Sequence, residues 1–113
     1  MTNNINTVSI DRDNEGYLVN PDDWTKEIAQ QFAEEEKLEL SDESWTVINF
    51  MRRYYNEHSV APDVRHAVKS LAESHDYEKK EAKQRMFTLF PYGYVKQACK
   101  IAGMKRPRGW STG

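Results

Sequence analysis

The segment S-D-E-S-W-T-V-I-N-F-M-R-R-Y-Y, residues 41–55, decides the fold of this chain. Ser41 is a favoured N-cap residue, and Asp42 and Glu43 behind it place negative charge at the positive end of a helix dipole. Apolar and aromatic side chains then recur at helical spacing, at Trp45, Val47, Ile48, Phe50, Met51, Tyr54 and Tyr55. This wide apolar face predicts a helix at the centre of the core.

Helical patterns continue towards the C-terminus. Pro62 stands at a first helical position, and the apolar face behind it pairs with residues 41–55 in the manner of a helix-turn-helix. Residues 78–90 form a charged helical pattern. Residues 94–102 form the last one, and Gly103 is its natural left-handed cap.

The N-terminal part mixes two patterns. Residues 7–10 and 17–19 flank a polar turn at 11–16, in which Asn14 and Gly16 tolerate positive φ, and this pattern predicts a short β-hairpin. Asn20 followed by Pro21 then predicts the start of a further helix, because a proline at the first helical position needs no amide partner.

Together these patterns predict an α+β fold: a small N-terminal β-hairpin or meander packed on an array of about five helices. We expect one domain over residues 1–113, with a folded core at 1–103. Residues 104–113 contain Pro107 and two glycines and show no period, which predicts an irregular, flexible C-terminal arm.

Composition restricts the function. No apolar run approaches the roughly 20 residues that span a bilayer, and the polar N-terminus is unlike a secretory signal. A single cysteine fits a reducing compartment, so we expect a cytoplasmic protein without membrane association. The three histidines are separated by eight and nine residues, which predicts no metal site. No cofactor-binding or hydrolase motif occurs, so we expect no cofactor and no independent active site.

Charge divides the chain in two. Residues 1–60 carry five basic and thirteen acidic side chains, whereas residues 61–113 carry eleven basic and five acidic ones. The last 23 residues, 91–113, contain no acidic residue and five basic ones: Lys96, Lys100, Lys105, Arg106 and Arg108. Such a tail attracts acidic partners, whether a protein surface, a nucleotide or a nucleic acid.

Cys99 permits two interpretations. It completes an apolar face with Val95, Ala98 and Ala102 at helical spacing, which is typical of a buried packing cysteine. Lys96 and its basic neighbours would instead favour the reactive thiolate, although a position late in a helix disfavours it. The pattern leaves this choice open.

Several segments, taken in order, resemble the DsrC/TusE family over most of the chain. They are D-N-E-G-Y-L at 13–18, D-W at 23–24, L-E-L-S-D-E-S-W at 38–45, I-N-F-M-R-R-Y-Y at 48–55, A-P-D-V-R at 61–65, L-F-P-Y-G-Y-V-K-Q-A-C-K-I-A-G at 89–103 and R-P-R-G at 106–109. The last two blocks follow the family's C-terminal signature, and their joint match is far more specific than any short motif.

The resemblance implies a small cytoplasmic protein with a β-meander on a helical array and a mobile arm. Family members carry sulfur, either beside dissimilatory sulfite reductase or, in the TusE branch, towards tRNA 2-thiolation. Their essential thiol is a cysteine at the penultimate residue of the arm, and in the first branch a second cysteine in the last helix can pair with it. By this resemblance Cys99 is the second cysteine, whereas Trp110 stands where the essential one belongs. An indole cannot hold a persulfide.

We therefore interpret the chain as a DsrC/TusE-like protein of sulfur metabolism that binds sulfur-relay proteins or dissimilatory sulfite reductase. Cys99 is the candidate sulfur carrier, and any activity is at most that of a sulfurtransferase. The candidate partner-binding residues are Arg65, Lys96, Lys100, Lys105, Arg106, Arg108 and Trp110. Two alternatives stay open: a regulatory paralogue without sulfur transfer, and a helix-turn-helix nucleic-acid binder, which the net charge of −2 disfavours.

Overall fold

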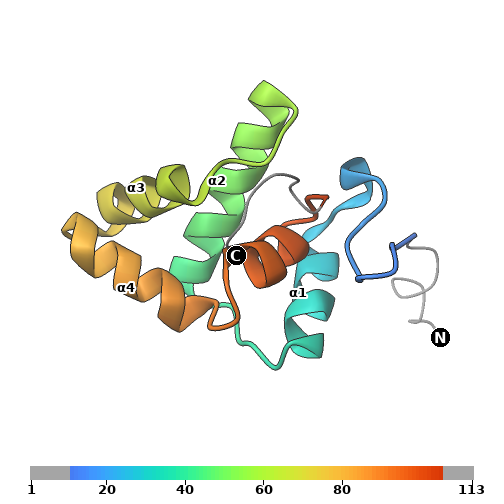
Figure 1. Ribbon diagram of the computed structural model, residues 1–113, viewed down its shortest axis with the longest axis horizontal. Helices are drawn as coiled ribbons and strands as arrows, with labels where there is room; N and C mark the ends of the chain where they lie inside the picture. The colour runs from blue at the N-terminus through green and yellow to red at the C-terminus, as the bar shows by residue number, and fades with distance from the viewer. Residues whose placement is uncertain (1–10, 106–113) are drawn as a thin grey trace.

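The structure is a computed structural model that describes residues 11–105. This part of the chain is helical, and Figure 1 shows the long helix α2 in the middle, with α3 and α4 on one side and α1 on the other. In chain order the elements are the 3₁₀ turn η2 (Pro21–Asp23), the helices α1 (Lys26–Glu35), α2 (Asp42–His58), α3 (Val64–His75) and α4 (Lys79–Leu89), and the π-helix η3 (Tyr94–Cys99).

Helix α2 is the centre of the core, as the sequence predicts. A capping box begins it: Ser41 Oγ accepts a hydrogen bond from the Ser44 amide at 3.2 Å, and Ser44 Oγ accepts one from the Ser41 amide at 3.1 Å. Val47, Ile48 and Met51 on its inner face are fully buried. The helix packs against α3 and against η3, so it connects both halves of the fold.

The predicted N-terminal β-hairpin is wrong, and the fold class is helical rather than α+β. Residues 11–105 contain no strand or sheet, only an isolated antiparallel bridge between Arg12 and Leu18; residues 7–10 lie outside the described part. The carboxylate of Asp13 accepts a hydrogen bond from the Tyr17 amide at 3.0 Å and bends the chain into a local turn. Tyr17 and Leu18 are neighbours and both buried, whereas a half-buried strand would alternate.

The helix predicted to start at Pro21 is divided into two elements. The turn η2 ends at Asp23, and α1 begins only at Lys26, where Thr25 Oγ1 accepts a hydrogen bond from the Ile28 amide at 3.2 Å. Thr25 is therefore the N-cap of α1, a second helix start that the prediction from Pro21 did not include.

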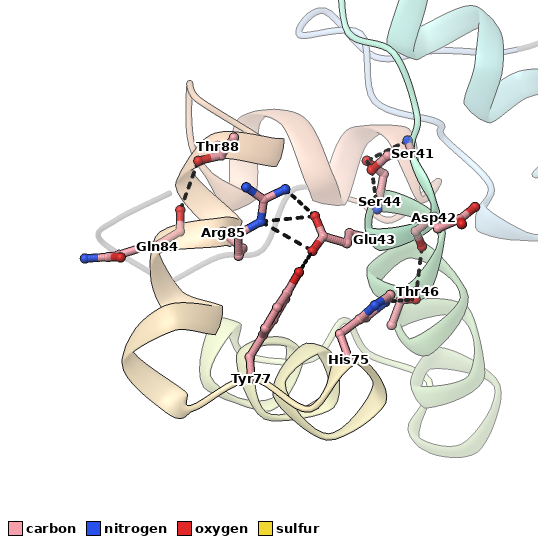
Figure 2. Close-up of polar contacts among 10 residues, drawn as sticks. All are labelled: Ser41, Asp42, Glu43, Ser44, Thr46, His75, Tyr77, Gln84, Arg85 and Thr88. Carbon is pink, nitrogen blue, oxygen red and sulfur yellow. Dashed lines mark hydrogen bonds and ion pairs between the residues drawn. The ribbon is translucent and has the colours of Figure 1, made fainter.

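A polar network ties the start of α2 to α3 and α4 (Figure 2). Glu43 of α2 accepts hydrogen bonds from the guanidinium of Arg85 on α4 and from the hydroxyl of Tyr77, which follows α3. Next to it, Thr46 Oγ1 and His75 Nε2 share a hydrogen bond at 2.9 Å. The bond from Arg85 holds the pKa of Glu43 below its usual value. This network joins the three helices at one end of the bundle.

The last helical segment is a π-helix over six residues that continues as α-helix at Lys100. It starts after Gly93, whose φ of 107° is strained for any other residue, and ends at Gly103 with φ of 78°, which confirms the predicted cap. Met104 is still buried, and its amide donates to the Cys99 carbonyl at 2.9 Å. The packed chain therefore extends through Met104.

Candidate functional site

Cys99 lies on the inner face of η3. The residue is 0% exposed, and Val95, Ala98 and Ala102 are buried with it in the core. Burial raises the pKa of the Cys99 thiol, because a thiolate loses its hydration in an apolar site. In this conformation the thiol is protonated at neutral pH and shielded from solvent, which is the opposite of what sulfur transfer requires.

The two lysines expected to activate Cys99 instead line a surface pocket. The pocket measures about 420 Å³ and is lined by Glu15, Tyr17, Glu36, Tyr92, Lys96 and Lys100. Lys100 Nζ lies 3.9 Å from a carboxylate oxygen of Glu36 and 5.1 Å from the centre of the Tyr17 ring. The pocket offers both signs of charge together with two tyrosine side chains, so it suits a polar group of a binding partner.

Gln97 fixes the inner wall of this pocket. Its buried side chain donates from Nε2 to Glu36 Oε1 at 2.9 Å and accepts at Oε1 from the Tyr92 amide at 3.0 Å. The Tyr17 hydroxyl donates to the Val95 carbonyl at 2.9 Å. These bonds hold the N-terminal turn, the end of α1 and η3 in one arrangement. The sequence pattern missed Gln97, because periodicity does not distinguish a buried amide from an exposed one.

Arg52 anchors the chain where it leaves η3, a role that the sequence pattern also missed. Its guanidinium donates to the carbonyls of Ala102 and Pro21, each at 3.0 Å, and lies 4.7 Å from the centre of the Trp24 ring. The Trp24 indole donates to the Ile101 carbonyl at 2.9 Å. A Cβ atom on Gly103 would approach Trp24 Cδ1 to 2.5 Å, so only glycine fits there. Arg52 lies next to the apolar stripe of α2 in the sequence, so helical spacing alone does not distinguish it from a core residue. The sequence contains no local signal for its partners, the carbonyls of Ala102 and Pro21.

The other predicted site residues are not brought together by the described structure. Arg65 is exposed on the first turn of α3, where its Nε lies 3.3 Å from Oδ1 of the N-cap residue Asp63, and it is not among the residues that line the pocket. Lys105 is exposed. Three predicted residues lie outside the described part of the chain: Arg106, Arg108 and Trp110.

Two further properties of the described part concern metals and membranes. Residues 11–105 hold no group of three histidine, cysteine, aspartate or glutamate side chains that would ligate a metal ion. None of the helices formed by these residues has the length and apolar character needed to cross a bilayer.

Comparison with known proteins places this arrangement in a family. The model of the family described as "DsrC like protein" matches residues 4–110. "Sulfurtransferase TusE" of Buchnera aphidicola subsp. Schizaphis graminum is 41% identical over 98 residues, which cover 87% of this chain and 85% of that protein.

Two solved structures share the fold. The oxidized γ-subunit of dissimilatory sulfite reductase (DsrC) from Archaeoglobus fulgidus superposes with a TM-score of 0.79 at 32% identity, covering 89% of this chain and 91% of that one. DsrC of Allochromatium vinosum gives a TM-score of 0.76 at 40% identity, with 89% of each chain covered. By family model, sequence identity and fold, the chain belongs to the DsrC family.

Proposed function

We propose that this chain is a docking protein of cytoplasmic sulfur relay, which binds sulfur-relay proteins or dissimilatory sulfite reductase without carrying sulfur on its own folded surface. Two similar proteins support the sulfur pathway: TusE of Buchnera aphidicola is named a sulfurtransferase, and the structural neighbour from Archaeoglobus fulgidus is a γ-subunit of dissimilatory sulfite reductase. Of the interpretations that the sequence left open, this is closest to a regulatory paralogue.

The burial of Cys99 carries the proposal. A sulfur carrier takes up sulfur when its thiolate attacks the outer sulfur of a donor persulfide and the donor thiolate leaves. It delivers sulfur when an acceptor attacks the outer sulfur of the carrier persulfide and releases the carrier thiolate, so both steps need an accessible carrier sulfur. Cys99 is 0% exposed and its pKa is raised by burial. By family resemblance the arm has Trp110 in the place of the carrier thiol, so it supplies no second nucleophile.

A persulfide-loading experiment tests the chemical half of the proposal. The native protein is incubated with glutathione persulfide and its intact mass is measured, with Cys99→Ser as the control. We expect no adduct of about 32 Da on the native protein and an adduct on the urea-unfolded protein, because only unfolding exposes the thiol. Rapid formation of an adduct on the native protein, absent in Cys99→Ser, would show that Cys99 is a carrier.

A second candidate function, sulfur carriage through Cys99, is favoured by one observation. Cys99 is the last residue of a π-helix. π-Helical segments are rare in proteins, and those that occur are often found at functional sites. Carriage would require η3 to open and expose the thiol. The same loading experiment separates the two functions, because an opening of this kind would load the native protein.

Binding to purified partners tests the docking half. Dissimilatory sulfite reductase and sulfurtransferases of the relay are immobilised, and the binding of the full chain is measured. We expect specific binding that survives Cys99→Ser, because the thiol takes no part in it. Equal absence of binding to all of them would contradict the proposed function.

A further inference from the structure

The described surface exposes two large aromatic side chains close together in sequence. Phe87 near the end of α4 is 63% exposed, and Tyr92 in the following turn is 73% exposed. Among the described residues, the other large apolar side chains that are exposed to solvent are valines. Exposed aromatic rings lose little entropy on binding and are typical anchors of protein interfaces.

Lysines accompany Phe87 along α4. Lys80, Lys83 and Phe87 follow one another at spacings of three and four residues, so they lie on one side of the helix, and all three are exposed. The inner side of α4 is formed by the buried residues Ala82 and Met86. Basic charge therefore runs beside the aromatic ring on a surface that no described element covers.

The residues that follow α4 in the sequence lead to the pocket. Tyr92 and Lys96 are exposed and also line the 420 Å³ pocket. Between residues 79 and 105 the sequence has seven basic side chains and one acidic one, Glu81. We call the surface formed by Lys80, Lys83, Phe87, Tyr92 and Lys96 the α4–η3 face.

We propose that the α4–η3 face is the docking surface for an acidic partner protein, an inference that rests on the proposed function and names the surface it uses. Phe87 and Tyr92 insert into an apolar recess of the partner, and an uncharged polar side chain of the partner enters the pocket beside Lys96. The lysines steer the encounter with an acidic surface. Glu15 and Glu36 in the pocket wall would repel a phosphate backbone, so a protein fits this face better than a nucleic acid does.

Paired variants test the face in the full-length protein. Binding to immobilised dissimilatory sulfite reductase and to relay sulfurtransferases is measured at low and high salt for Phe87→Ala/Tyr92→Ala and for Lys80→Glu/Lys83→Glu. The matched control is Val60→Ala/Lys69→Glu, which removes an exposed apolar side chain and reverses a charge elsewhere. Circular dichroism checks that each variant is folded.

We expect the aromatic pair to weaken binding by at least about tenfold, because interface anchors carry most of the affinity. The lysine pair should slow association and reduce its salt dependence. The control should bind like the wild type.

The other outcomes overturn the inference. If the wild type binds and both variants bind equally well, the face is not the docking surface, although the proposed function stands. If the wild type binds none of these proteins, both proposals fail. Self-association of the wild type that Phe87→Ala/Tyr92→Ala abolishes would assign the face to a second copy, and tight salt-dependent binding of duplex RNA or DNA through the same lysines would assign it to nucleic acid.

Discussion

Replacing Arg52 with alanine tests the anchor that fixes the C-terminal end of the described chain. The guanidinium makes hydrogen bonds to two carbonyls, on Ala102 and Pro21, and lies over the Trp24 ring. The variant loses all of these contacts at once, and they join three segments that are far apart in the sequence.

The magnitude follows from these contacts. A hydrogen bond from a charged donor contributes about 1.5–3 kcal/mol, and the stacking on Trp24 adds about 1 kcal/mol. Burial opposes them, because it makes the charge costly, as the lowered pKa of Arg52 shows. We expect the free energy of unfolding to fall by about 3 kcal/mol, which lowers Tm by about 12 °C in a domain of this size.

The assay is urea unfolding followed by circular dichroism, with the slope of the transition compared between variants. Arg53 supplies the matched control: it is the next residue of α2 and exposed, so Arg53→Ala should change stability by no more than about 0.5 kcal/mol. Arg52→Lys should be more stable than Arg52→Ala, because it keeps a positively charged donor. It should be less stable than the wild type, because an ammonium group does not reach both carbonyls in the same geometry. Equal stability of Arg52→Ala and Arg53→Ala would refute the anchor.

Two further variants test the packing around the site. Gly103→Ala should lower stability by about 2–3 kcal/mol, because φ is 78° there and the new Cβ would meet Trp24; thermal unfolding at wild-type Tm would count against that contact. Glu43→Gln should cost about 1 kcal/mol at pH 7, because it weakens the bonds from Arg85 and Tyr77. The pKa of Glu43 is lowered from 4.5, so the wild type keeps this contribution above that pH and loses it as the pH falls further. The stability difference between wild type and Glu43→Gln should therefore narrow below pH 4.5, and a difference that stays constant down to acid unfolding would contradict the assignment.

The sequence predicted the central part of the fold well. The Ser41 cap, the buried face of α2 and the left-handed Gly103 all have local signals, because capping and amphipathic spacing depend on residues that are close in the chain. The prediction of an N-terminal hairpin was wrong because the local pattern behind it is short. Alternation over three or four residues is a weak signal, and the hydrogen bonds of the Asp13 side chain bend the chain locally instead.

The candidate site was harder to predict than the fold. Over six residues, a π-helix and an α-helix have nearly the same apolar pattern, so the sequence did not indicate which way Lys96 and Lys100 point relative to Cys99. Arg52 and Gln97 act through carbonyl and carboxylate partners that are 31 to 61 residues away. Contacts of this range depend on tertiary packing, which no local pattern contains.

The labelling rate of Cys99 in the native protein tests the central claim most directly, and the chain has one cysteine, so the signal is unambiguous. The protein is mixed with a thiol-specific reagent at increasing urea concentrations below the unfolding transition. We predict labelling at least about 100-fold slower than in the unfolded chain, with a rate that rises with urea because the thiol becomes accessible only when the core opens. Labelling of the native protein at the unfolded rate, independent of urea, would show an accessible thiol and contradict the docking account.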